Sequence, residues 1–420
     1  MSQTYRPDTP QQVADLITWA LAEPTPLDLR GHGTKSALGR PTNTSHALDL
    51  SGIAGIVDYA PQELVMTARA GTSMAEVQSA LDTAGQMLAF EPPDWRALLG
   101  QPHGPNDPPG TLGGLVACNL AGSRRIAAGA ARDHVLGVAG VSGRGEAFKS
   151  GGRVVKNVTG FDLSKLLTGS MGTLAALTEL SLKTVPRPET SATVLVLGLD
   201  EASAVQAMTR ALGSSHEVSG AAHLPVAMTA RSAVAAIAGG GQAVTALRVE
   251  GPAPSVAWRC QALRTDLAGI GPTEAPMDAL SHDDGVVLWA EISDGRLIAD
   301  PPEAVVWRLS VPPAQGARVL AAVRHRVGEA SLLGWQMDWG GGLLWLTLAP
   351  TPTAQVEAVR DAVARQGGGH ATMIRAGADV RAHVPVFEPQ PAPLAALSRR
   401  VTESFDPKGI LSPGRMAEGR

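Results

Sequence analysis

Three glycine-rich segments constrain this chain more than any other feature of its sequence. They read LRGHGTKSALG over residues 29–39, PGTLGGLVACNLAGS over 109–123 and GSMGTL over 169–174. The 47 glycines are about 11% of the 420 residues, against a usual share of about 7%. Glycine has no Cβ, so its backbone N–H groups can turn toward an anion at close range. We therefore expect loops that together hold a phosphate-bearing ligand, and the alternative for each loop alone is a simple tight turn.

Composition and charge exclude several classes of protein. Lys and Arg number 35 and Asp and Glu 39, so the net charge is −4, which argues against nucleic-acid binding. Two cysteines, Cys118 and Cys260, cannot supply the four thiolates of an iron–sulfur cluster or a structural zinc. No apolar run reaches the roughly 20 residues of a membrane span, and the first residues lack the pattern of a signal peptide. We expect a cytoplasmic protein.

The first half of the chain alternates short strands and helices. Apolar residues at helical spacing predict a helix over 10–22, and Ser73 is placed to cap a helix over 74–84. The proline-rich stretch 90–114 predicts a long loop. We expect helices over 163–168 and again after Gly172, and a domain boundary at the proline pair of 186–188.

The second half has a different character. Residues 189–385 hold β-rich pieces, among them TVLVLGL, VTALRVEG, GVVLWAEIS, AVVWRLSV and LLWLTLAP, and these alternate with alanine-rich helical pieces. Such interleaving predicts an α+β domain on an antiparallel or mixed sheet. A proline-rich linker and a helix then lead into FDPKGILSPGRM, so residues 386–420 form a separate terminal segment.

None of the glycine segments fits GxGxxG or GxxxxGK[ST], but their order resembles another group of proteins. RGHGT, GTLGGLVACN and GSMGTL are similar to the FAD-binding segments of the vanillyl-alcohol oxidase / p-cresol methylhydroxylase (PCMH) superfamily. GRVVKNVTGFDL, WRLS and the FDPKGILSPGRM tail are similar to the FAD-binding (E) subunits of bacterial glycolate oxidase. The likeness covers roughly residues 10–190 and the tail. In residues 189–385, which we call the cap, it extends only over short patches.

The resemblance implies a fold and a set of cofactor-binding residues. The fold would be a two-part α+β FAD-binding domain over 1–188, a cap over 189–385, and a segment 386–420 that packs back on the FAD domain. The residues implied to bind FAD are Arg30, Gly31, His32, Gly33, Thr34, Lys35, Pro109, Gly110, Thr111, Gly113, Gly114, Asn119, Gly122, Ser123, Val154, Val155, Gly169, Gly172 and Thr173.

His32 has two interpretations. Some relatives carry a histidine in this loop that bonds covalently to the flavin, so His32 is a candidate for such a link. The glycolate oxidase group mostly has a small residue there, and we expect non-covalent FAD with His32 as a polar neighbour.

The cap lacks the catalytic residues that its relatives use. A motif resembling HxGDGN, which holds a metal in the sister subunit, is absent, and the cap histidines show no ligand spacing, so we expect no metal site. Arg308 is the candidate for binding a substrate carboxylate, because arginine binds carboxylates with two parallel hydrogen bonds, and its alternative role is a salt bridge at a strand edge. The catalytic base stays unknown.

The resemblance implies the FAD-binding subunit of a complex that oxidises glycolate, a 2-hydroxy acid, to glyoxylate. The implied partners are a sister FAD subunit and an iron–sulfur subunit, and peripheral attachment to the inner membrane through the complex is a further expectation. Two alternatives stay open: an assembly subunit with a vestigial FAD site, and a self-sufficient 2-hydroxy-acid oxidase.

Overall fold

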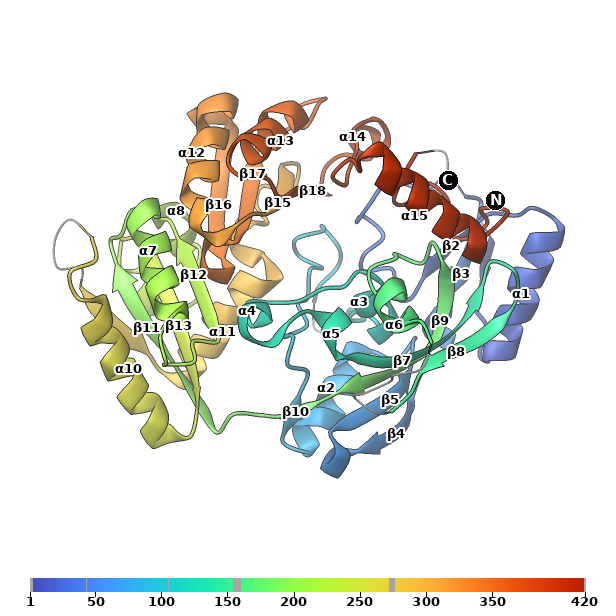
Figure 1. Cartoon of the computed structure of the whole chain (residues 1–420), viewed down its shortest axis with the longest axis horizontal. Coiled ribbons are helices and arrows are strands. Elements are labelled where there is room, and N and C mark those ends of the chain that lie inside the picture. Colours follow the sequence, from blue (N-terminus) through green and yellow to red (C-terminus); the bar gives the residue numbers. More distant parts are fainter. Residues whose placement is uncertain (1–2, 43, 105, 154–159, 272–275, 419–420) are drawn as a thin grey trace.

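The protein consists of two lobes that lie side by side (Figure 1). A computed structural model describes residues 3–42, 44–104, 106–153, 160–271 and 276–418. The first lobe holds three small sheets and the second holds a single eight-stranded sheet. The C-terminal segment returns from the second lobe to the first.

A three-stranded parallel sheet opens the first lobe. It runs in the order β1 (Gln3–Tyr5), β3 (His46–Asp49), β2 (Leu27–Arg30). Helix α1 (Pro10–Ala22) starts as predicted, where Thr9 and Gln12 form a capping box. Its buried face, with Val13 and Ile17, packs in one apolar cluster with Leu27 and with Leu411 of the tail.

A five-stranded antiparallel sheet forms the centre of the first lobe. Its order is β4 (Ile56–Ala60), β5 (Val65–Arg69), β9 (Ala175–Lys183), β7 (Val135–Ser142), β8 (Ala147–Gly151). A short ribbon pairs β6 (Gln86–Met87) with β10 (Val185–Pro186). The helices of this lobe are α2 (Met74–Thr83), α3 (Leu112–Ala117), α4 (Arg125–Ala128), α5 (Ala131–His134) and α6 (Leu163–Leu167).

Strand β9 corrects one prediction. The helix expected after Gly172 is absent, and a nine-residue strand runs from Ala175 instead. This strand lies between β5 and β7, and seven of its nine residues are buried. A strand covered on both faces loses the alternation of apolar and polar residues, so its sequence cannot be told from a buried helix by periodicity.

The second lobe is built on one antiparallel sheet with helices on its outer face. The strand order is β14 (Met277–Leu280), β11 (Thr190–Leu197), β13 (Val244–Gly251), β12 (Gly220–Leu224), β16 (Leu332–Asp338), β17 (Leu343–Leu348), β15 (Val305–Ser310), β18 (His370–Arg375). The outer helices are α7 (Glu201–Leu212), α10 (Ala253–Leu267), α12 (Gly316–Val327) and α13 (Val356–Arg365). Shorter helices are α8 (Val226–Thr229), α9 (Ala235–Ala238) and α14 (Ala378–His383), and α15 (Ala392–Phe405) follows in the tail.

Helix α11 (His282–Asp294) corrects a second prediction, because GVVLWAEIS was expected as a strand. Ser281 accepts a hydrogen bond from the Asp284 N–H, and Gly295 ends the helix in the left-handed conformation. These start and stop signals decide the structure where a short apolar run is ambiguous.

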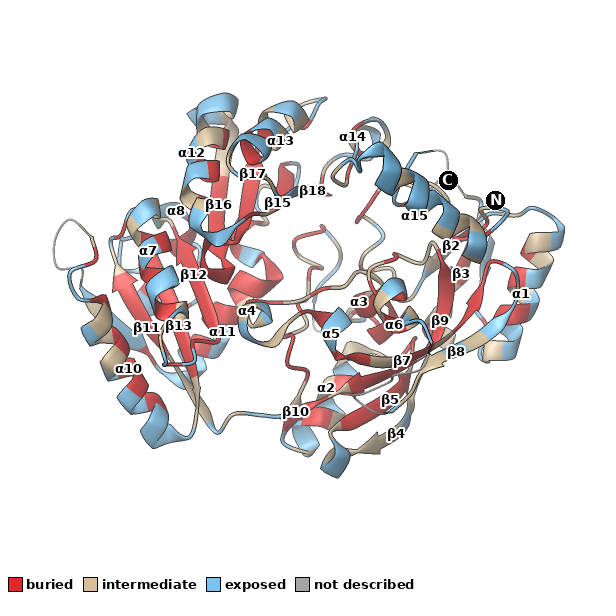
Figure 2. Ribbon diagram, in the orientation of Figure 1, coloured by how far each residue is buried: buried red, intermediate tan, exposed pale blue. Residues whose placement is uncertain are grey.

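The two lobes share a continuous apolar core. Buried side chains of the first lobe and of the sheet's inner face belong to one cluster, and the strands in Figure 2 are coloured largely as buried. Trp95 of the first lobe meets Trp345 of β17 edge to face, with ring centres 5.4 Å apart. The side chain of Asp294, on α11, accepts a hydrogen bond of 2.7 Å from the Asp94 N–H. The relative position of the lobes is therefore set by packing as well as by connection.

Candidate functional site

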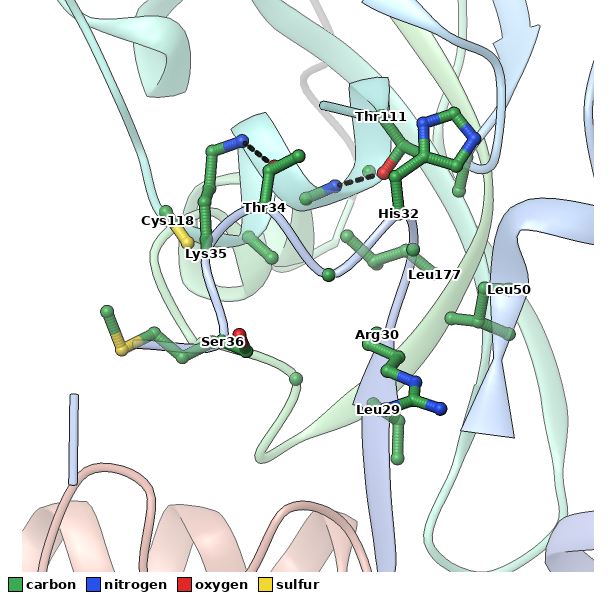
Figure 3. Close-up of a pocket in the computed structure, with 18 of the residues that line it drawn as sticks. Leu29, Arg30, His32, Thr34, Lys35, Ser36, Leu50, Thr111, Cys118 and Leu177 are labelled. Carbon is green, nitrogen blue, oxygen red and sulfur yellow. Dashed lines mark hydrogen bonds between the residues drawn. The ribbon is translucent and has the colours of Figure 1, made fainter. Parts of the chain in front are cut away.

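A groove lies where the first two glycine segments meet (Figure 3). It contains about 840 Å³ of atom-free space, part of which is open solvent. The walls are the loop after β2, the start of α3, the loop before β9 and the C-terminal tail. Of the residues that the sequence predicted for the cofactor, those that line it are Arg30, Gly31, His32, Gly33, Thr34, Lys35, Thr111, Gly113, Gly114 and Gly172.

The first and second glycine segments touch at Gly31 and Thr111. A Cβ on Gly31 would lie 2.3 Å from the Thr111 Oγ1 atom, so only glycine fits there. The same hydroxyl accepts a hydrogen bond of 3.2 Å from the Gly114 N–H and caps α3. Thr111 thus fixes the start of α3 against the first loop, with the helix N–H groups near the groove.

The two glycines that begin α3 serve different purposes. A Cβ on Gly113 would lie 2.8 Å from both the Cβ and the carbonyl oxygen of Ala70, so Gly113 permits close packing onto the end of β5. A Cβ on Gly114 would meet only the Thr111 Oγ1 atom, at 3.2 Å. Gly114 therefore keeps space open in the groove itself.

Lys35 provides a positive charge in the groove. Its ammonium group donates a hydrogen bond of 3.2 Å to the Thr34 hydroxyl (Figure 3), and a Cβ on Gly110 would lie 2.6 Å from the Nζ atom. Within the described ranges no carboxylate forms an ion pair with it. Burial lowers the pKa of Lys35, and burial raises the pKa of the neighbouring Cys118 thiol. An ammonium group stripped of water and without a counter-charge favours an anionic ligand.

His32 is fixed by one short hydrogen bond. Its Nδ1–H donates to the Pro109 carbonyl at 2.5 Å, because a carbonyl can only accept. The bond joins the first glycine segment to the second.

Arg415 joins this groove from the far end of the chain. Its guanidinium donates to the Asp28 carboxylate at 2.6 Å and to the carbonyls of Ser36 and Leu38 at 2.9 and 3.2 Å. The Leu27 N–H donates to the Ile410 carbonyl at 2.8 Å, so the tail continues the first sheet. The tail was expected to return here, but no sequence signal singled out Arg415.

Other predicted residues lie around the groove rather than in its lining. Gly169 donates its N–H to the Val116 carbonyl at the end of α3. The Asn119 side chain accepts a hydrogen bond from the Arg132 N–H. The rest outside the lining are Pro109, Gly110, Gly122, Ser123 and Thr173. Val154 and Val155 lie outside the described residues.

Ser123 leads from the second glycine segment to the seam between the lobes. Its hydroxyl donates a hydrogen bond of 2.6 Å to the Asp338 carboxylate at the end of β16. The Trp339 N–H donates to the same carboxylate at 2.7 Å, and the Trp339 indole donates to the Gly122 carbonyl at 3.1 Å. Burial raises the pKa of Asp338 to about 7, although these hydrogen bonds act in the opposite direction.

Arg308 lies at this seam. Its guanidinium carbon is 4.8 Å from the ring centre of Trp339, and its buried Nε has no hydrogen-bond partner among the residues that the structure describes. Burial and then the charge of Arg125 lower the pKa of Arg308 to about 10. The predicted salt bridge at a strand edge is not formed with any described residue. Sequence reasoning did not single out Arg125, Asp338 or Trp339 as residues of a site.

The described part of the chain offers neither a metal site nor a membrane span. Outside the undescribed gaps, no group of three or more His, Cys, Asp or Glu side chains is placed to hold a metal ion. Among the described helices, none combines the length and the apolar character needed to cross a bilayer.

Comparisons with known proteins agree with this geometry. Residues 1–151 match the family described as FAD binding domain. The chain is 33% identical over 413 residues to the glycolate oxidase subunit GlcE of Escherichia coli, with 97% of each chain covered. It is 30% identical over 192 residues to the glycolate oxidase subunit GlcD of Bacillus subtilis, which covers 46% of this chain and 38% of that protein.

The fold is shared with a solved structure. The crystal structure of p-cresol methylhydroxylase with substrate bound superposes with a TM-score of 0.70 over 99% of this chain and 89% of that one, at 13% identity. The predicted α+β, PCMH-type fold is confirmed.

Proposed function

This chain belongs to the family of the glycolate oxidase subunit GlcE, and from that membership we propose that it is the FAD-binding subunit of a complex that oxidises glycolate to glyoxylate. The family and the matching FAD binding domain make it an FAD-dependent oxidoreductase. The observation that carries the proposal is the groove, in which closely packed glycines, a capped helix start and an unpaired ammonium group converge on one open space.

The residues of the groove fit the diphosphate of FAD. Gly33 has φ +74° and nothing within 4 Å of its Cβ position, so no protein atom covers the first loop at this position. The Lys35 ammonium would bind the diphosphate oxygens. The N–H groups of Leu112, Gly113 and Gly114 already donate to the Thr72 and Ala70 carbonyls and to the Thr111 hydroxyl, so the start of α3 shapes the groove and does not supply donors. Bound FAD supplies a two-electron acceptor for the C–H bond of a 2-hydroxy acid. Leu29, Leu50 and Leu177 provide apolar surface in the same groove.

Electron transfer onward requires a partner. Oxidation of glycolate to glyoxylate releases two electrons and two protons, and a reduced flavin must pass those electrons on. With two cysteines, this chain cannot ligate an iron–sulfur cluster. We therefore assign the exit of electrons to a separate iron–sulfur subunit, with a sister FAD subunit in the same complex.

The groove weighs against a vestigial site. Gly31 is required by its contact with Thr111 whether or not FAD binds. The Cβ position of Gly33 has no neighbour within 4 Å and that of Gly114 only the Thr111 hydroxyl, so the groove is still open for a ligand. The self-sufficient oxidase keeps some support, because a buried carboxylate and a free arginine meet at the lobe seam.

An anaerobic absorbance experiment tests the proposal. The purified chain should show flavin bands, and glycolate should bleach them in the co-purified complex. A complex that contains flavin but is not bleached by glycolate would refute glycolate as the substrate. A colourless chain that does not take up added FAD would refute the proposal that this chain binds FAD. Bleaching of the isolated chain would favour the self-sufficient oxidase.

A further inference from the structure

Two arginine side chains at the lobe seam share one tryptophan ring. Arg125, on α4 of the first lobe, has its guanidinium carbon 4.2 Å from the ring centre of Trp339, and Arg308, on β15 of the second lobe, lies 4.8 Å from the same centre. Arg308 also lies 5.8 Å from the ring centre of Trp345. The two cations come from different lobes, and both lie against the Trp339 ring.

Neither guanidinium is neutralised by a neighbour. In the parts of the chain that the structure describes, neither the Arg125 side chain nor the Arg308 side chain forms a hydrogen bond or an ion pair. The nearby Arg248 differs in this respect, since it pairs with Glu91 at 2.6 Å. Arg124, the sequence neighbour of Arg125, pairs with Glu250.

Asp338 supplies at most part of the missing charge. Its charge acts on Arg308, and its two oxygens accept hydrogen bonds from the Ser123 hydroxyl and the Trp339 N–H. Burial raises the pKa of Asp338 to about 7, so its negative charge is incomplete near neutral pH. The seam therefore carries up to two positive charges with no full counter-charge, and a partly buried guanidinium left in that state is costly.

We propose that Arg125 and Arg308 form a binding site for a small carboxylate between the two lobes. A guanidinium group is planar and its N–H donors form a fixed fork, which suits a planar carboxylate better than a spherical ion. Because the donors come from both lobes, the bound anion bridges them.

The position of this site indicates which anion it would bind. Arg125 follows the second glycine segment directly, and α4 contacts β12 and the turn at Trp339–Gly341. The residues of the FAD groove do not include either arginine. Resting on the proposed function, we assign the anion to the carboxylate of the 2-hydroxy acid, so that this subunit binds substrate itself and is more than a carrier of FAD.

Binding of oxalate, a carboxylate that cannot be oxidised as a 2-hydroxy acid, tests the proposal by calorimetry on the purified full-length chain. Arg308→Met and Arg125→Met keep an apolar stem on Trp339 but remove the charge. Each should weaken oxalate binding at least about tenfold, since a charge-assisted pair is lost. Arg399→Met, at an exposed position of α15, is the matched control and should bind like the wild type.

The outcomes separate this inference from the proposed function. Unchanged oxalate affinity in both methionine variants would overturn the two-arginine site, as would a flavin-containing wild-type chain that binds no oxalate. Because Arg308 is partly buried, Arg125→Met at the exposed position shows the loss without risk to folding. Oxalate binding by a chain without flavin bands would support the anion site while the proposed function failed.

Discussion

The contact between Gly31 and Thr111 allows a quantitative prediction for Gly31→Ala. The new methyl group would lie 2.3 Å from Thr111 Oγ1 and 2.8 Å from its Cγ2, whereas non-bonded carbons settle at roughly 3.5–4.0 Å. Overpacking of this kind costs about 1–3 kcal/mol. If Thr111 rotates away, it loses its bond to the Gly114 N–H, and a lost helix cap costs about 1 kcal/mol. We expect a total loss of about 2–4 kcal/mol in the free energy of unfolding.

Urea unfolding of four proteins measures this coupling. Wild type, Gly31→Ala, Thr111→Ala and the double variant form a double-mutant cycle. Thr111→Ala alone should cost about 1 kcal/mol through the lost cap. In its background Gly31→Ala should cost much less than in the wild type, because both clashing atoms are gone. The double variant should therefore be about 1–3 kcal/mol more stable than the sum of the two single effects predicts.

Gly33→Ala is the control for backbone strain. Gly33 has φ +74° and nothing within 4 Å of the position that a methyl group would take, so its cost of about 1–2 kcal/mol arises from the left-handed conformation alone. That cost should not change in the Thr111→Ala background. An equal cost of Gly31→Ala with and without the Thr111 side chain would refute the contact between the two glycine segments.

Three further predictions address the tail, the seam and the flavin link. Arg415→Met leaves the Asp28 carboxylate unpaired and should lower the free energy of unfolding by about 3 kcal/mol, and an unchanged urea midpoint would contradict it. Burial raises the pKa of Asp338 from 3.8 to about 7, so the contribution of this carboxyl group to wild-type stability should fall as pH rises from about 4 to 7. Asp338→Asn cannot ionise, so its stability relative to the wild type should rise over that window by up to roughly 4 kcal/mol, and a constant difference would refute the shift. Acid precipitation should release FAD and leave a colourless pellet, and a pellet that stays yellow in the wild type but not in His32→Ala would show a covalent link.

The glycine segments made the groove predictable from sequence. Gly31, Gly33 and Gly114 all line this groove. Gly31 has no room for a Cβ beside Thr111 and Gly33 has φ +74°, whereas a Cβ on Gly114 would meet only the Thr111 hydroxyl, at 3.2 Å. The start of α1 could also be predicted from the sequence, as could the return of the C-terminal segment to the first lobe, because capping residues and prolines act locally.

The lobe seam was not predictable in the same way. Arg125 is far from Asp338 and Trp339 in the sequence and meets this adjacent pair only because β16 ends beside α4. No local pattern marks a side chain whose importance comes from a partner in another lobe. The errors at β9 and α11 have a related cause, since burial on both faces or against a sheet hides the period that sequence reasoning uses.

The most direct test of the central claim is a titration of FAD into flavin-free protein, followed by the quenching of flavin fluorescence. We predict saturable binding of one FAD per chain by the wild type. Gly114→Val, which places a branched side chain in the groove, should abolish binding while its urea midpoint stays near that of the wild type. Equal FAD affinity in this variant, or no binding by the folded wild-type protein, would contradict the account.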